Sequence, residues 1–412
     1  MRPRARDCGI IIGSLPTGAH NAITDVPGVK VGHSTLIEGE GPLVPGVGPV
    51  RTGVTAIWPH SGDLFYEKVA ACVHTINGFG EVTNADQVHE MGVIEGPILI
   101  TNTMNVPRVA DYAIDWALDR YPQMGVTDWG ISPLVSETSD LYLNDIRGRH
   151  VSREHVFAAI DGATAGPVEE GSVGGGTGMS CLGFKGGIGT ASRIVEIGDR
   201  RFAVGVLVQS NFGRRGDLRI DGAPVGRELL PWLDEADRQH AAKQPEQNEV
   251  EPALSEGGGA KDASSHSNSH SNSIIVVVAT DAPLTVRELR RVAVRASFGL
   301  ARVGSMGGTT SGDFVIAFSS ANRVAHRPES SLYEWRALVE MITRERPGDP
   351  PPINSLFIAA IEATEEAILN STFKSPTMVG RDDHVRHGLP IEETVEIMRR
   401  YGHPEVHLPD SM

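Results

Sequence analysis

The sequence has few cysteines, few aromatic residues and no long apolar run. Its 412 residues include only three cysteines, Cys8, Cys72 and Cys181, whose wide spacing fits neither a disulfide framework nor a zinc site. No stretch approaches the roughly 18 apolar residues of a membrane span, and the apolar run 8–12 is too short for a signal-peptide core. We therefore expect a cytoplasmic protein with no membrane partner.

Positive charge is also scarce, with 37 Lys+Arg against 52 Asp+Glu and a formal net charge of -15. Nucleic-acid binding needs clustered positive charge to meet the phosphates, so this balance argues against a nucleic-acid partner. Glycine, by contrast, is abundant at 47 residues, and hydrophobic residues make up 40% of the chain. These values predict a globular α/β protein with many tight turns.

Residues 1–235 alternate apolar runs with glycine-rich turns, and residues 106–118 have the spacing of an amphipathic helix. Short apolar runs typical of buried strands occur at 54–58, 98–101 and 202–208. From 239 to 272 large apolar side chains almost disappear. Because so polar a segment cannot bury enough surface to offset its ordering entropy, we expect a mobile surface loop there.

A strongly structured stretch follows this polar segment at once. Residues 274–279 (IIVVVA) are β-branched and continuous, which is typical of a strand buried on both faces. Thr285 and Glu288 form a capping box at the start of a predicted helix over 285–302. We also expect a loop at 304–312, a strand at 314–318 and helices near 331–345, 355–370 and 391–401. The change from the polar segment to the buried strand falls at Ser273, which suggests that this residue has a function of its own.

Common catalytic signatures are incomplete in this chain. The glycine-rich stretch 174–189 matches neither a phosphate loop nor a dinucleotide fingerprint. Gly183 lies one residue too far from Ser180 for a nucleophile elbow. His384 and His387 have no third metal ligand nearby in the sequence. Since no histidine is placed as a general base, a serine nucleophile would need another proton acceptor.

Two motifs in the second half of the chain carry a family resemblance. Residues 272–283 (NSIIVVVATDAP) and 304–314 (GSMGGTTSGDF) resemble the DmpA-type aminopeptidases, peptidase family S58, a group of L-aminopeptidase/D-esterases and β-aminopeptidases. Supporting stretches are 23–33 (ITDVPGVKVGH), 51–58 (RTGVTAIW), 137–145 (ETSDLYLND), 166–193 and 209–213 (QSNFG). The resemblance implies a single α/β domain, a four-layer αββα sandwich like that of N-terminal-nucleophile hydrolases.

The same resemblance implies an inactive precursor that cuts its own Asn272–Ser273 bond. The products would be an α-chain of residues 1–272 and a β-chain of residues 273–412, assembled as a homotetramer without metal or organic cofactor. The implied activity is that of a serine aminopeptidase or amidase, which releases N-terminal amino acids from short peptides, amides or esters. Two alternatives stay open. One is an acyltransferase of the ornithine-acetyltransferase type, which normally uses threonine, and the other is a non-catalytic small-molecule-binding member of the fold.

Self-cleavage would supply the missing base. A free α-amine on Ser273 has a reference pKa of about 7.7–8.0, which suits a general base near neutral pH. If the strands 274–279 and 314–318 are joined by the helix in a parallel crossover, their N-terminal ends share a sheet edge. Ser311 and Asp313 then lie beside Ser273, and the resemblance implies that they orient the nucleophile and its amine.

The resemblance also implies roles for residues of the first half. Asn211 matches the asparagine that stabilises the oxyanion, and Glu137 matches the acidic residue that binds the substrate's free amino group. Where the family pattern has an aromatic residue two positions after this glutamate, this chain has Ser139. Tyr142 is the nearest tyrosine and becomes the candidate for contact with substrate.

Overall fold

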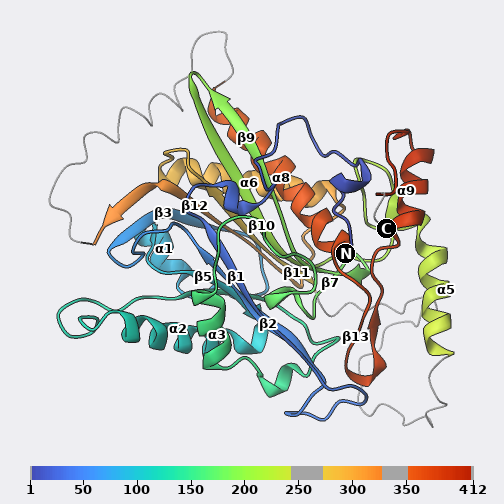
Figure 1. Ribbon diagram of the computed structural model, residues 1–412, viewed down its shortest axis with the longest axis horizontal. Helices are drawn as coiled ribbons and strands as arrows, with labels where there is room; N and C mark the ends of the chain where they lie inside the picture. Colours follow the sequence, from blue (N-terminus) through green and yellow to red (C-terminus); the bar gives the residue numbers. More distant parts are fainter. Residues whose placement is uncertain (1, 243–271, 327–350, 410–412) are drawn as a thin grey trace.

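Two β-sheets lie face to face at the centre of the molecule, with helices on their outer sides (Figure 1). The computed structural model describes residues 2–242, 272–326 and 351–409. The first sheet has the strand order β1 (Lys30–Glu38), β2 (Val50–Trp58), β5 (Ile98–Asn102), β6 (Leu134–Thr138). The second has the order β4 (Val93–Ile94), β3 (Glu67–Gly78), β12 (Ser311–Ala325), β11 (Asn272–Thr280), β10 (Arg200–Asn211), β9 (Gly187–Ile197).

Two pairs of helices form the outer layers. Helices α2 (Val106–Arg120) and α3 (Arg153–Asp161) pack on the four-stranded sheet, and α6 (Val286–Arg302) and α8 (Ile353–Phe373) pack on the six-stranded sheet (Figure 1). The remaining α-helices of the described residues are α1 (Ala85–Met91), α4 (Val225–Glu228), α5 (Leu230–Ala241) and α9 (Ile391–Arg400). Two small hairpins are β7 (Ser180–Cys181) with β8 (Phe184–Lys185), and β13 (Met378–Val379) with β14 (Val385–Arg386). The expected αββα layering is thus confirmed.

Strand β11 shows how the layers are held together. Its side chains alternate, so that Ile275 and Val277 pack in the layer between the sheets while Ile274 and Val276 pack on the side of α6 and α8. Burial of this apolar surface on both faces drives the two sheets and the helices together. By the same alternation, Ser273 faces the layer between the sheets.

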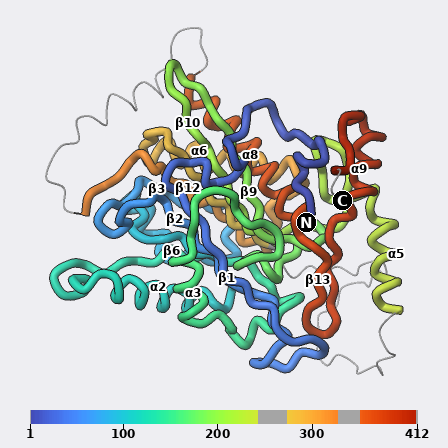
Figure 2. Tube along the Cα trace, viewed as in Figure 1, coloured from blue at the N-terminus to red at the C-terminus, as the bar shows by residue number. Residues whose placement is uncertain are grey.

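The C-terminal hairpin of β13 and β14 lies beside α5 (Figure 2). His387 Nε2 is 3.2 Å from Asp237 Oδ1 of this helix, and His240 Nε2 is 2.8 Å from the carbonyl oxygen of Asp383. These contacts fix the C-terminal hairpin against the segment that precedes β11 in the chain.

Most of the elements expected from the sequence are present, and the strands are longer than expected. The strands at 54–58, 98–101 and 202–208 are β2, β5 and β10, and the helices at 106–118, 285–302, 355–370 and 391–401 are α2, α6, α8 and α9. Thr285 caps α6, because its side chain accepts a hydrogen bond from the Glu288 amide at 3.3 Å. The helix expected near 331–345 lies outside the described residues.

Three further boundaries differ in ways that bear on the strands and the polar segment around Ser273. Strand β12 begins at Ser311 instead of 314, so Ser311 and Asp313 belong to the strand and not to a loop. Strand β11 already begins at Asn272. Residues 239–241 end helix α5, whereas 243–271 of the expected polar loop lie outside the described residues. In the described stretches of chain, no helix combines the length and the apolar character needed to cross a bilayer.

Candidate active site

The pairing of three strands brings four of the predicted site residues, Asn211, Ser273, Ser311 and Asp313, to one end of the six-stranded sheet. Strand β11 runs antiparallel to β10, with Asn211 opposite Ser273. It runs parallel to β12, with Ser273 opposite Gly312 and Ile274 opposite Asp313. The parallel crossover through α6 is therefore confirmed, and it joins residues 39 positions apart in sequence.

Ser273 is nearly buried at this end of the sheet, with 7% of its surface exposed. Its Oγ accepts a hydrogen bond from the Gly312 amide at 3.2 Å. Because any side chain on Gly312 would approach the carbonyl of Phe79 within 2.7 Å, only glycine lets these backbone segments meet here.

Ser311 and Asp313 lie two residues apart on β12 and share the opposite face of the sheet. Ser311 Oγ donates to Asp313 Oδ1 at 2.6 Å, and the backbone N–H of Ile274 also donates to this carboxylate. The second oxygen, Oδ2, has no hydrogen-bond partner among the described residues. Burial raises the pKa of Asp313 above its ordinary value, since it outweighs the two hydrogen bonds. An acceptor thus remains available beside the first residues of β11.

Asn211 ends strand β10 and is fully buried. Its Oδ1 accepts from the Ser180 amide at 2.8 Å, and its Nδ2 donates to the Ser139 carbonyl at 2.9 Å. Because a backbone N–H can only donate, these contacts fix which end of the amide is nitrogen. Directly opposite residues of antiparallel strands share a face, so Asn211 and Ser273 are side-chain neighbours. Among the described residues the second N–H of Nδ2 has no hydrogen-bond partner, so it is left for a ligand.

Glu137 reaches this region from strand β6 of the other sheet and is 3% exposed. Thr103 Oγ1 donates to its Oε2, and the Glu81 amide donates to its Oε1 at 3.3 Å. A Cβ built on Gly80 would lie 2.9 Å from Glu137 Oε1 and 3.0 Å from Gly312 Cα. Gly80 therefore lies between the Glu137 carboxylate and Gly312, the residue that pairs with Ser273. Burial is the main reason that the pKa of Glu137 is raised.

Tyr142 does not join this group directly. Its ring stacks on His384, with centroids 4.5 Å apart and planes at 9°, and the Arg386 guanidinium lies 3.5 Å from the ring centroid. Arg386 Nε in turn donates to Ser180 Oγ at 2.9 Å. In the contacts described, Tyr142 therefore reaches Asn211 only through Arg386 and Ser180, and its contact with substrate stays a prediction.

No sequence pattern assigned a role in this site to Asn77, Thr103 or Ser180. Asn77 Nδ2 donates to the carbonyl oxygens of Ser311 and, at 3.2 Å, Thr309, which steadies the turn that enters β12. A β-bulge next to this point shifts the register between β3 and β12. Asn77 and Thr309 are 232 positions apart, so no local pattern could have joined them.

Comparison with known proteins agrees with this geometry. The family model for peptidase family S58 matches residues 21–386. The chain is 43% identical to the beta-peptidyl aminopeptidase BapA of Sphingosinicella xenopeptidilytica over 398 residues, which cover 96% of this chain and 91% of that protein.

Two solved structures extend the comparison to the fold. The PH0078 protein of Pyrococcus horikoshii OT3 is 47% identical, with a TM-score of 0.81 over 97% of this chain and 100% of that one. The L-aminopeptidase D-Ala-esterase/amidase of Ochrobactrum anthropi, described as a variant of the Ntn hydrolase fold, is 38% identical, with a TM-score of 0.78 over 98% and 99%. The expected N-terminal-nucleophile hydrolase fold is thus confirmed, and the chain belongs to peptidase family S58, the aminopeptidase hydrolases that its sequence motifs indicated.

Proposed function

We propose that this aminopeptidase is made as a precursor, cuts its Asn272–Ser273 bond and then acts through an acyl-enzyme on Ser273. The observation that carries the proposal is the convergence of Asn211, Gly312 and Asp313 on the first residues of β11. On this basis the chain divides into an α-chain of residues 1–272 and a β-chain of residues 273–412.

Self-cleavage begins when Ser273 Oγ attacks the carbonyl carbon of Asn272. The C–N bond then breaks as the acyl group moves from nitrogen to oxygen and the hydroxyl proton passes to the released nitrogen. Water then hydrolyses the resulting ester, which frees the carboxyl group of Asn272 and restores the Ser273 hydroxyl. The product is a free α-amine on Ser273, beside the buried carboxylate of Asp313. This carboxylate favours a nearby ammonium by charge-assisted hydrogen bonding, and Ser311 fixes its orientation.

In the mature enzyme, the α-amine of Ser273 takes the hydroxyl proton as Oγ attacks the acyl carbon of the substrate. The remaining N–H of Asn211 Nδ2 stabilises the negative charge that develops on the carbonyl oxygen. The protonated amine then gives its proton to the leaving group, and water resolves the acyl-enzyme. Every proton transfer thus uses groups at the start of β11.

Glu137 is proposed to bind the free ammonium group of the substrate and so to restrict hydrolysis to chain termini. We expect Glu137→Gln to lower kcat/KM by about 10- to 100-fold, since a hydrogen bond to a charged group contributes about 1.5–3 kcal/mol. Self-cleavage should persist, because the Asn272–Ser273 bond presents no ammonium group. Steady-state kinetics with alanine p-nitroanilide and with its N-acetyl form, which lacks the ammonium group, measure the change in kcat/KM. If Glu137→Gln still discriminates as strongly against the acetylated substrate, the assignment is wrong.

The pH dependence of KM offers a second test of Glu137. Its buried carboxyl has a pKa raised above the 4.5 of an ordinary glutamate, and only the carboxylate attracts an ammonium. As the pH falls through this raised pKa, the wild-type KM should therefore increase. In Glu137→Gln the KM should stay level over the same range. If the KM of Glu137→Gln increases at low pH as it does in the wild type, a group other than Glu137 causes the increase.

Short peptides and amino-acid amides are the proposed substrates, and amides of β-amino acids are included. The relatives named as a beta-peptidyl aminopeptidase and as a beta-aminopeptidase from Burkholderia sp., at 43% and 38% identity, support this range. Hydrolysis rates of β-alanine and L-alanine p-nitroanilides compare the two classes directly. A homotetramer of processed chains is proposed from the family resemblance, and light scattering of the purified enzyme measures it.

A further inference from the structure

We propose that Arg386 is a positioning residue for Asn211 and acts through Ser180. The inference rests on the proposed role of Asn211 as the oxyanion donor. It adds to the site a residue of the C-terminal hairpin that is far from Ser273 in sequence.

A continuous chain of hydrogen bonds carries the inference. Arg386 Nε donates to Ser180 Oγ at 2.9 Å, and the Ser180 amide donates to Asn211 Oδ1 at 2.8 Å. The other end of the Asn211 amide is fixed by the Ser139 carbonyl at 2.9 Å. Since all three side chains are at most 8% exposed, water has little access to replace any link. The orientation of the oxyanion donor therefore depends on where Arg386 holds Ser180.

Arg386 itself is held in one orientation. Its guanidinium lies 3.5 Å from the centroid of the Tyr142 ring, and His384 stacks on the same ring. The His384 ring nitrogen Nδ1 is 2.8 Å from the Tyr142 carbonyl oxygen, which ties the hairpin to the segment after Glu137. A long side chain with these contacts has little rotamer freedom left, so it can act as a fixed support.

The β7–β8 hairpin transmits the position of Arg386 to Asn211. At one end, the Leu182 amide donates to the Phe212 carbonyl at 2.6 Å, next to Asn211. At the other, the Lys185 amide donates to the His387 carbonyl at 2.8 Å, next to Arg386. The hairpin thus lies between the two residues, and a shift of Ser180 would move the side-chain amide of Asn211, whose Oδ1 accepts from the Ser180 N–H.

Charge favours the same role. Burial is the main reason that the pKa of Arg386 is lowered, yet a guanidinium stays protonated in proteins. Lys185 is fully buried nearby, and burial followed by the Arg386 charge lowers its pKa to about 7. Its Nζ donates to the Gly176 and Gly186 carbonyls and not to Ser180. Among the described residues, Arg386 is therefore the cation linked to Asn211 through Ser180, and its fixed charge favours an oxyanion there.

The test compares Arg386→Met, Arg386→Lys and Ser180→Ala, with kcat expressed per processed β-chain. We expect Arg386→Met and Ser180→Ala to lower kcat by about 10- to 100-fold, as for a displaced catalytic group, with little change in KM. Arg386→Lys should recover part of the loss. In an Asn211→Ala background, Arg386→Met should cost much less, because residues that act through one another are not additive.

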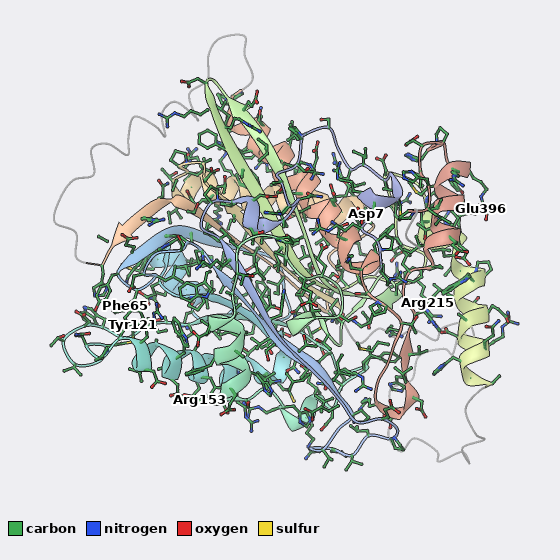
Figure 3. All side chains as sticks on the ribbon, viewed as in Figure 1. Asp7, Phe65, Tyr121, Arg153, Arg215 and Glu396 are labelled. Atoms are coloured by element: carbon green, nitrogen blue, oxygen red, sulfur yellow. The ribbon has the colours of Figure 1, made fainter. Side chains whose placement is uncertain are left out.

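Arg215→Met is the matched control. Arg215 lies beside α5 (Figure 3), where it pairs with Asp237, and it donates no described hydrogen bond to Ser180. Its removal takes away a nearby positive charge but leaves the Arg386–Ser180–Asn211 chain intact. We expect its kcat to match that of the wild type, whereas a loss equal to that of Arg386→Met would contradict the inference.

The outcomes separate this inference from the proposed function. If Asn211→Ala slows the enzyme but Arg386→Met and Ser180→Ala do not, only the positioning role is wrong. If Asn211→Ala itself leaves kcat unchanged, the oxyanion role and the inference both fail. If Arg386→Met lowers kcat equally in the wild-type and Asn211→Ala backgrounds, the positioning role of Arg386 is also wrong. Should Arg386→Met lose cooperative thermal unfolding, Ser180→Ala, which removes one hydroxyl, decides the question.

Discussion

Replacement of Ser273 by alanine is expected to leave one uncleaved polypeptide of 44.1 kDa and to abolish measurable aminopeptidase activity. The variant lacks the Oγ that attacks Asn272, so the α-amine that serves as base never forms. Loss of a nucleophile that acts together with its base lowers kcat by on the order of a million-fold in a well-studied serine protease. Denaturing electrophoresis and release of p-nitroaniline measure the two effects on the same sample.

Ser269→Ala is the matched control for Ser273→Ala. It removes the serine of a second Asn-Ser pair, Asn268–Ser269, four residues earlier in the sequence. Because only Ser273 adjoins the buried residues of β11, the control should be cleaved and active like the wild type. Normal cleavage in Ser273→Ala, or lost cleavage in Ser269→Ala, would show that the cut is made elsewhere.

Replacement of Asn211 by alanine is expected to lower kcat by about 100- to 1000-fold, the usual loss when one oxyanion donor is removed. The KM should change little, because the donor acts on charge that develops only in the transition state. The same N–H should assist the tetrahedral intermediate of self-cleavage, so processing should be slower as well. Steady-state kinetics per processed chain and a time course of cleavage measure both.

Asn354→Ala provides the comparison for Asn211→Ala. Asn354 is only partly buried, in the first turn of α8, and it makes no described hydrogen bond to Ser273 or Asn211. Its replacement should leave both kcat and the rate of cleavage unchanged. A kcat for Asn211→Ala within a few-fold of that of Asn354→Ala would reject the oxyanion role.

Local sequence patterns were sufficient for the elements that carry the site. The continuous apolar run before Asp281, and the capped amphipathic helix after it, indicated a buried strand and a crossover helix. Because parallel strands joined in this way share an edge, the neighbourhood of Ser273, Ser311 and Asp313 followed from topology. The positions of Asn211 and Glu137 came instead from the family resemblance.

The contacts that surround these residues could not be predicted in the same way. The hydrogen bonds of Asn77 to the Ser311 carbonyl and of Arg386 to Ser180 join residues 234 and 206 positions apart. Such pairs depend on how hairpins pack against the sheets, and neither periodicity nor spacing records that. Strand β12 begins at Ser311 because its pairing with β11 overrides the turn-like composition of the glycine-rich stretch before Phe314.

The central claim is that Ser273 becomes an N-terminal nucleophile, and N-terminal sequencing of the active wild-type enzyme after denaturing electrophoresis tests it most directly. The account predicts two chains, of 272 and 140 residues, with the smaller beginning Ser-Ile-Ile-Val. Aminopeptidase activity should increase in step with that fragment as the precursor is consumed. Full activity from an intact chain, or from a smaller fragment that begins at any other residue, would contradict the account.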